Sequence, residues 1–568
     1  MSRANGLLIV AVCVVMVAGC APASSPGAAA TSAGSSQPNP PKRVVVAIMG
    51  DANTLYAKLN ASAGNVPGLD SVQELTNGGL SVLNTQGALV AQLAEAVPSV
   101  ENGLWKVFPD GGMETTWRIR EGARWHDGTP FTTADLLFTA TVMQDPELPS
   151  FGHPTTRLLE ALDAPDSRTL TARWKQAFII ADALFSRDVG YPLPRHLLER
   201  TYTEERAQFL LLPHWNEQFI GTGPFKLRQF VRGSHLVLDA NPDYVLGRPK
   251  IDVIEVRFIP DSATLGANIL AGEIDLTIGR SLSQEQALQV RDQWREGGMF
   301  VAPYALTRIY SQFINPSPTV LLGVQFRRAL VHALDRQTMV DTLESGLTEV
   351  AHGVLPPGRP EFRDVEAGIM RYDYDPRRAT ELVEALGYTR GSDGFFRDSA
   401  GARLGLEIRA TAGQDILEKP VLLAADSWQR VGIAAEPLFI PVQRNQDRDY
   451  RHNRPGLQLA GGTSDLQILG YFHSSEIPLA ETNYVGDNQS RYASAEYDGL
   501  YERYVVTVPQ AERQQLLRRL VHHIAENLPI IALYYRVEPT MVAHRMQNVQ
   551  ARQRQATQAW NAHEWDAN

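Results

Sequence analysis

A histidine and an aspartate stand next to each other in the segment WHDGTPF, at residues 125–131. A His–Asp pair orients the general base in many hydrolases, so this is where catalysis must first be considered. The neighbouring residues favour architecture. Asp127-Gly128 is a turn signal, Pro130 stiffens the approach, and Phe131-Thr132 precedes an apolar run. The segment is therefore interpreted as a turn that leads into a helix, with the histidine packed locally.

Other motifs of catalysis are missing from the chain. It contains no G-x-S-x-G, no H-E-x-x-H, no P-loop and no G-x-G-x-x-G that opens a helix. Among the thirteen histidines, His522 and His523 are adjacent on a predicted helix, so their side chains diverge by about 100° and cannot easily share one metal. We predict no enzyme activity, no metal site and no cofactor.

The two cysteines, Cys13 and Cys20, belong to a targeting signal. Leu7 to Val17 is an apolar run of eleven residues, too short to span a bilayer and typical of a signal peptide. It ends in Val17-Ala18-Gly19-Cys20, which is similar to a bacterial lipobox. We predict a signal peptide over 1–19, lipidation at Cys20 and a flexible Ala/Ser/Gly/Pro-rich tether over 20–42. The body would then have no thiol, which excludes cysteine catalysis and iron–sulfur clusters.

The composition of the 568-residue chain is that of a globular protein. Its formal net charge of −10 argues against a nucleic-acid partner, which usually requires a basic face. No other stretch is long and apolar enough to cross a membrane, so the body is expected to be soluble.

The periodicity of the body predicts an α/β fold. Residues 43–49 form a β-branched run typical of a central buried strand. Residues 114–120 alternate as a half-buried strand does, and Thr132 with Asp135 forms a box-like helix start, with Phe131 and Leu136 placed as a hydrophobic staple. A strand at 253–259, a helix through 270 and a strand near 274–276 suggest a βαβ unit. Helices are expected near 324–334 and 510–527, and a strand at 529–535.

Several segments, taken in order, resemble family 5 of the bacterial ABC-importer solute-binding proteins, the oligopeptide/dipeptide/nickel-binding lipoprotein group. The segment that contains WHDGTPF is similar to the family signature. The resemblance covers about Arg43 to Asp566 and rests on the following blocks: LAE at 93–95, WRIREGARWHDGTPFTTADLLF at 117–138, GTGPF at 221–225, VQFRRALVHALDRQTMVD at 324–341, RYASAEYDGLYERYVVT at 491–507 and ENLPIIALYY at 526–535.

This resemblance implies a two-lobed periplasmic-binding-protein clamshell (type II-like, cluster C) with an extra subdomain inserted in lobe I. Lobe I would comprise 43–70, 192–304 and 530–568, including the tail WNAHEWD at 560–566. The subdomain would be 71–191 and lobe II 305–529, with hinge crossings near 305 and 529. Ligand would bind in the cleft as the lobes close.

The resemblance also implies candidate ligand-binding residues. In peptide-binding members, an Asp in a Trp-x-x-Asp-Tyr-like segment pairs with the peptide amino terminus. The matching segment keeps Asp465 but has Gly462 and Leu466 at the Trp and Tyr positions, and the alternative for Asp465 is a loop cap. The other candidates, each of which could instead be a turn or core residue, are Asn53, Thr54, Tyr304, Tyr310, Tyr471 and Phe472.

We therefore expect an extracytoplasmic receptor, lipid-anchored in the periplasm or on the outer face of the cytoplasmic membrane. It would capture a small solute, with a short peptide favoured, and deliver it to ABC permease subunits that work with cytoplasmic ATPases. A monomer is expected. The alternatives are a metal chelate, a sugar or another non-peptide solute on the same fold, and a sensor or chaperone lipoprotein without transport.

Overall fold

The computed structural model describes residues 40–568 apart from 61–65, 359, 445–446 and 553–555. The predicted signal peptide, Cys20 and all but the last residues of the tether lie outside the described residues. No helix within the described part of the chain is long and apolar enough to cross a membrane.

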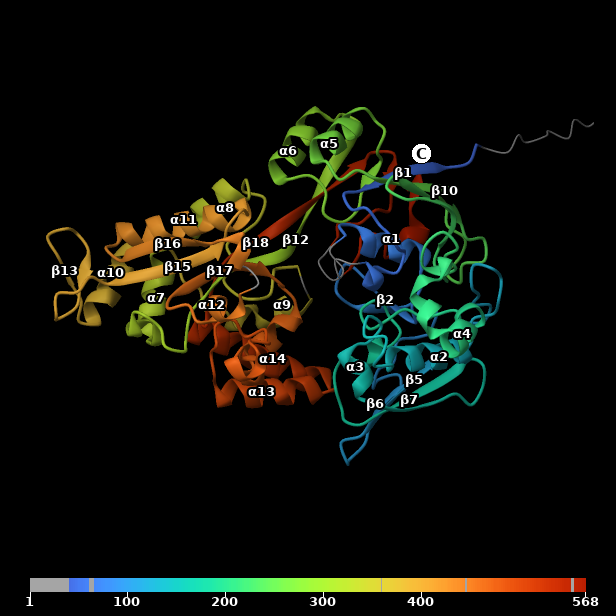
Figure 1. Cartoon of the computed structure of the whole chain (residues 1–568), viewed down its shortest axis with the longest axis horizontal. Coiled ribbons are helices and arrows are strands. Elements are labelled where there is room, and N and C mark those ends of the chain that lie inside the picture. The colour runs from blue at the N-terminus through green and yellow to red at the C-terminus, as the bar shows by residue number, and fades with distance from the viewer. Residues whose placement is uncertain (1–39, 61–65, 359, 445–446, 553–555) are drawn as a thin grey trace, which may run out of the picture. The chain divides into compact units, whose positions relative to one another are not determined.

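A ten-stranded mixed sheet runs through the body of the chain (Figure 1). Strand β1 is parallel to its neighbours β10 and β11 on both sides, so the prediction of a central buried strand at 43–49 is confirmed. The strands, in order across the sheet, are β16 (Ala434–Ile440), β15 (Gly405–Thr411), β17 (Leu457–Gly462), β12 (Gly297–Tyr310), β18 (Ile530–Ala543), β11 (Leu276–Thr277), β1 (Arg43–Ile48), β10 (Val253–Phe258), β9 (His235–Ala240) and β8 (Phe225–Val231).

The two long strands β12 and β18 lie side by side and are shared by both lobes (Figure 1). The far end of β18, with Met541 and Val542, packs in the core of lobe I. Its first residues, such as Tyr534 and Tyr535, pack in lobe II. The register of the pair shifts between Pro303 and Ala305. We propose that the hinge crossings lie at this irregularity and, on β18, after Tyr535 rather than at 529.

Lobe I packs helices and the C-terminal tail on its part of the sheet. Its core joins residues of β1, β10 and β18 with Trp565 and Ala567 of the tail. The elements concerned are α1 (Leu69–Thr76), α5 (Ser262–Leu270), α6 (Gln284–Gln293), β19 (Met546–Gln547) and β20 (Asp566–Ala567).

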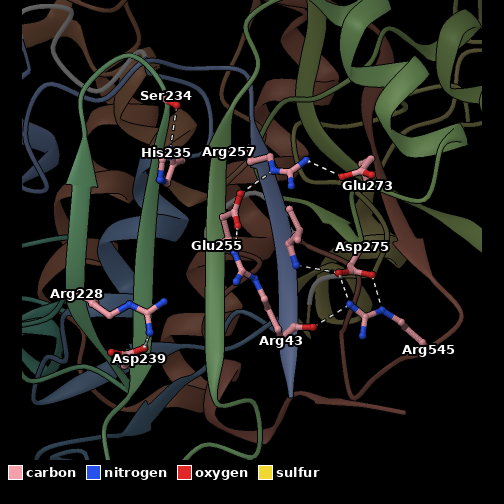
Figure 2. A network of polar contacts seen from close by, with 11 residues as sticks. Arg43, Arg228, Ser234, His235, Asp239, Glu255, Arg257, Glu273, Asp275 and Arg545 are labelled. Atoms are coloured by element: carbon pink, nitrogen blue, oxygen red, sulfur yellow. Dashed lines mark hydrogen bonds and ion pairs between the residues drawn. The ribbon is translucent and has the colours of Figure 1, made fainter. Parts of the chain in front are cut away.

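A polar network fastens one face of the lobe I sheet (Figure 2). The buried carboxylate of Asp275 accepts hydrogen bonds from the backbone N–H of Val45 at 2.8 Å and from Arg545 Nε at 2.6 Å. Arg545 also donates to the carbonyl of Arg43 at 2.9 Å. Charge-assisted bonds of this kind are stronger than neutral ones. The network therefore holds β1, the first strand of the body, to the residues that precede β11 and follow β18.

Lobe II buries both faces of its five strands. One face is covered by α7 (Val324–His332), α8 (Arg336–Leu343), α10 (Pro376–Ala385) and α11 (Asp415–Arg430). The other is covered by α9 (Pro360–Val365), α13 (Ala495–Val506), α14 (Gln510–Asn527) and the 3-10 helix η8 (Leu466–Phe472). The short elements here are α12 (Arg448–His452), β13 (Thr389–Arg390) and β14 (Phe396–Arg397). The helices predicted near 324–334 and 510–527 are confirmed as α7 and α14.

The inserted subdomain has its own antiparallel sheet and core. As predicted, a strand precedes the turn and a helix follows it: the backbone N–H of Thr132 donates to the Asp135 carboxylate at 2.9 Å, and Phe131 and Leu136 lie in one hydrophobic cluster. The strands and helices of this part and its borders are β2 (Ser81–Leu83), β3 (Leu89–Ala91), β4 (Trp105–Val107), β5 (Met113–Arg118), α2 (Thr133–Met143), α3 (Pro154–Arg157), β6 (Leu159–Asp163), β7 (Thr169–Trp174) and α4 (Arg195–Glu204).

Candidate functional site

The His–Asp pair of WHDGTPF is a structural joint. His126 is buried, its Nδ1 accepts the backbone N–H of Gly221 at 3.1 Å, and its Nε2 donates to the carbonyl of Gly223 at 3.1 Å. Asp127 instead accepts the Thr129 N–H at 2.9 Å within the turn. The interpretation as architecture is confirmed, but the expectation of local packing is wrong for His126, because its partners lie on a distant loop of the chain.

That loop, GTGPF, is in turn pressed against the end of α1. A Cβ on Gly221 would lie 2.0 Å from the carbonyl oxygen of Thr76, and one on Gly223 would lie 2.4 Å from the Thr76 carbonyl carbon. The hydroxyl of Thr222 donates to the Gly78 carbonyl at 2.9 Å. Both glycines are therefore required by close backbone approach, and the most recognisable blocks of the chain join the subdomain to lobe I.

Asn53 and Thr54 lie in the loop that follows β1, and Asn60 holds this loop. The side-chain oxygen of Asn60 accepts the backbone N–H of Asn53 at 3.1 Å and that of Thr54 at 3.3 Å. The Thr54 hydroxyl donates to the carbonyl of Tyr56 at 2.9 Å. The Asn53 side chain is exposed. Loops at the carboxyl ends of parallel strands are where α/β proteins place ligands, so the site prediction for this loop stands as a proposal.

Tyr310 lies at the lobe II end of β12 and is buried against a charged group. Arg308, which is 2% exposed, donates from Nε to the Tyr310 hydroxyl at 2.8 Å and from Nη1 to the Thr463 carbonyl at 2.9 Å. A Cβ on Gly462 would lie 2.6 Å from Arg308 Nη2. The glycine at the Trp position of the family segment thus makes room for a buried guanidinium.

Asp465 lies three residues after Gly462 and is the N-cap of the 3-10 helix η8. Its carboxylate accepts the Gln467 N–H at 2.9 Å, which is the loop-capping role that the sequence left open. The residue is 4% exposed. Burial, together with the carboxylates of Asp487 and Asp465, raises the pKa of the half-buried Tyr471. Phe472 is in the core of lobe II, edge-on to Tyr497 at 6.1 Å between ring centroids.

Three of the predicted residues lie near one another in lobe II: Tyr310 and Tyr471 belong to one hydrophobic cluster, and Asp465 is the N-cap of the 3-10 helix that carries Tyr471. We call Tyr310, Asp465 and Tyr471 the candidate group. Tyr304 lies apart, at the irregularity of β12, with Arg536 5.1 Å from its ring centroid. The sequence reasoning missed Arg308 and the arginines near α12. The only local signal for them was the density of arginine in RNQDRDYRHNR at 444–454.

A cavity of about 420 Å³ lies elsewhere in lobe II, beside α8 and the residues that follow it. Arg336, His352, Tyr372 and Tyr374 are among its lining residues. Arg336 is buried and donates to the carbonyls of Ala351 and Ala532 at 2.8 and 2.9 Å. The volume is sufficient for a small organic molecule.

Histidines and carboxylates do not gather into a metal site in the described part of the chain, where no group of three or more potential ligands is found. His522 Nδ1 bonds the carbonyl of Gly368 at 3.1 Å, whereas His523 Nε2 pairs with the Tyr492 hydroxyl at 2.9 Å. The two adjacent imidazoles therefore have different partners, as their helical spacing predicts.

A sheet shared by two lobes, joined by two long strands and carrying an inserted subdomain, defines a two-lobed α/β binding protein. The model "Bacterial extracellular solute-binding proteins, family 5 Middle" matches residues 89–473, more than half of the chain. The chain belongs to this family of ABC-transporter solute-binding proteins, whose relatives are binding proteins and not enzymes.

Individual relatives bind different solutes. The chain is 24% identical over 436 residues to the oligopeptide-binding protein AppA of Bacillus subtilis, which covers 75% of this chain and 76% of that one. It has the fold of an oligopeptide-binding protein from Thermus thermophilus complexed with a pentapeptide (TM-score 0.65, 24% identity, 92% and 96% covered). It also has the fold of NikA from Brucella suis in complex with Fe(III)-EDTA (TM-score 0.74, 17% identity, 93% and 100% covered).

Proposed function

We propose that the protein captures a short peptide between its lobes and delivers it to an ABC permease. The observation that carries the proposal is the proximity of Tyr310, Asp465 and Tyr471, because this candidate group combines a carboxylate with aromatic rings. A carboxylate suits a peptide ammonium, and aromatic walls suit the rest of a short peptide. The likeness to an oligopeptide-binding relative supports the same solute class.

The experiment that tests this function is a thermal-shift screen of the 43–568 body against di- to pentapeptides, oligosaccharides and metal chelates. A ligand present at about 100 times its dissociation constant should add about 2.7 kcal/mol of stability. We expect peptides to raise the melting temperature. If a chelate or a sugar does so and no peptide does, the peptide assignment is wrong and the alternative solutes take its place.

Asp465 offers a sharper test, because its two roles can be separated. Asp465→Asn keeps an acceptor for the Gln467 N–H, whereas Asp465→Ala removes the cap and should cost about 1 kcal/mol of stability. If the carboxylate binds a peptide ammonium, both variants should weaken binding of a peptide found in the screen by about tenfold or more. Calorimetric titration measures this, with the N-acetylated peptide as control. Unchanged affinity in Asp465→Asn would remove this residue from the site.

We further propose that the protein is a monomer held at the membrane by a lipid on Cys20. Cys20→Ser should move the protein from the membrane fraction to the soluble fraction, since no described helix can span a bilayer. A mature Cys20→Ser protein that still sediments with membranes would contradict the anchor. Sedimentation of the 43–568 body at a dimer mass would contradict the monomer.

A further inference from the structure

Lobe II buries a group of cations that the solute-capture proposal does not use. Arg454 follows α12, Arg491 lies in the loop before α13, and Arg409 is on β15. We call these three residues the arginine cluster. Arg454 is only 1% exposed, and the other two are also buried. Guanidinium groups are rarely buried to this extent without an anion to pair with them.

The hydrogen-bonding capacity of the cluster is only partly used. Arg454 Nη2 donates to the Gln489 carbonyl at 2.6 Å, but Nε and Nη1 have no partner among the residues that the structure describes. Arg491 Nη1 donates to the carbonyl of His452 at 3.1 Å and to Asn453 Oδ1 at 3.0 Å, whereas its buried Nε has no described partner. Three buried nitrogens, which together carry four N–H bonds, therefore have no acceptor among the described residues.

The carboxylates near the cluster do not pair directly with Arg454 or Arg491: Glu481 acts on Arg491 only at longer range, and Asp449 is bonded to Asn453. Arg409 pairs with Glu407, but Arg454 and Arg491 form no ion pair with any carboxylate in the described ranges. Burial and the neighbouring arginines lower the pKa of Arg454 to about 9. The cluster is thus desolvated and carries an excess of positive charge, which an oxyanion would neutralise.

The backbone at Arg491 supports a functional role. Its φ of +60° is in the left-handed region that glycine adopts freely and that arginine rarely adopts. Non-glycine residues persist in this region where surrounding contacts hold them, and they concentrate at ligand-binding sites. In this conformation the Arg491 guanidinium donates to the carbonyl of His452 and lies near Arg454.

The cluster adjoins Tyr310 of the candidate group. Gln458 of β17 is paired with Arg409 of β15 on one side and with Tyr310 of β12 on the other, so the three side chains share one face of the sheet. The buried Oε1 of Gln458 also lacks a partner within the described residues. Tyr310 therefore lies between the buried cation Arg308 and the arginine cluster.

We propose that the arginine cluster binds a compact oxyanion, a carboxylate, phosphate or sulfate group, beside Tyr310. Arg454 and Arg491 present several N–H donors, and oxyanions offer the multiple acceptors that guanidinium groups bind best. This chemistry has two sources. The oxyanion is either part of the captured solute or a free inorganic anion that neutralises the buried arginines of lobe II.

The test measures the melting temperature of the 43–568 body in sodium phosphate, sodium sulfate and sodium acetate, each against sodium chloride at equal ionic strength. We expect a saturable rise in the wild type and at least a tenfold loss of apparent affinity in Arg454→Gln and Arg491→Gly. Arg491→Gly keeps the experiment decisive if Arg454→Gln does not fold, because glycine suits the φ at this position. The exposed Arg200→Gln on α4 is the charge-matched control.

Each outcome has a distinct meaning. A response to phosphate or sulfate supports the site and assigns it to an inorganic anion, and a response to acetate alone supports it and assigns the carboxylate of a solute. An identical response in the wild type and in the cluster variants reflects only the general effect of salt and overturns the proposal. Solute capture is not affected by that failure, because the solute screen uses the unaltered protein.

Discussion

Replacing Gly221 with alanine should lower the free energy of unfolding by about 3 kcal/mol or more. The added methyl group would lie 2.0 Å from the carbonyl oxygen of Thr76 and 3.0 Å from the ring of Phe219. The contact with Thr76 cannot be relieved by a side-chain movement, because it is with backbone. The GTGPF loop is also held from its other side, since the carbonyl of Gly221 accepts the backbone N–H of His126 at 2.9 Å.

Urea denaturation of the 43–568 body measures this effect, with Gly499→Ala as the matched control. Gly499 is inside α13, and a Cβ there meets no atom within 4 Å. Alanine at 499 should therefore be neutral or stabilise the protein by up to about 1 kcal/mol, since glycine weakens a helix interior. If the free energy of unfolding of Gly221→Ala is within about 1 kcal/mol of the wild-type value, the GTGPF loop can move away from α1 and the prediction is wrong.

Local signals in the sequence predicted several of the elements. The β-branched run at 43–49 became β1, the box of Thr132 and Asp135 begins α2, and the leucine stripe at 510–527 became α14. In each case the evidence lies within one element, where periodicity and capping are short-range effects. The placement of the tail at 560–566 in lobe I came from the resemblance and not from local signals; in the structure Trp565 packs with residues of β1 and β18.

The contacts of the candidate site could not be predicted in this way, because they join distant parts of the chain. Nothing near Gly462 indicates that Arg308 fills the space beside it, 154 residues earlier in the sequence. The departure from the Trp-x-x-Asp-Tyr pattern was visible, but its meaning, a buried cation in place of an apolar ring, required the pairing of β12 with β17. His126 is a second example, since its imidazole binds a loop 95 residues away.

The free energy of unfolding should fall by about 3 kcal/mol through His126 alone as the pH drops from 7 to 4. Burial lowers the pKa of His126 from 6.5 to about 4, so the folded protein keeps this imidazole neutral. The unfolded chain protonates the same group near pH 6.5. Between pH 6.5 and 4 the unfolded state binds more protons, and stability that is complete above pH 6.5 is lost as the pH falls.

The geometry explains why the folded state resists protonation. Nδ1 accepts the N–H of Gly221 at 3.1 Å, so a proton on Nδ1 would break the bond that joins the subdomain to lobe I. Lys226, which donates to the His126 carbonyl at 2.8 Å, adds a second positive charge nearby. Acidification should therefore loosen this joint before it affects the neutral core around it.

Urea denaturation at pH 7.5, 5.5 and 4.5 separates this contribution from other buried histidines, such as His214, whose pKa burial lowers to about 3. The quantity compared is the loss of stability between pH 7.5 and 4.5 within each protein. His126→Gln should lose about 2.5 kcal/mol less than wild type over this interval, whatever its stability at pH 7.5. His544→Gln, at an exposed position, should follow the wild type. If His126→Gln shows the full acid sensitivity of the wild type, the imidazole of His126 is not the group that titrates.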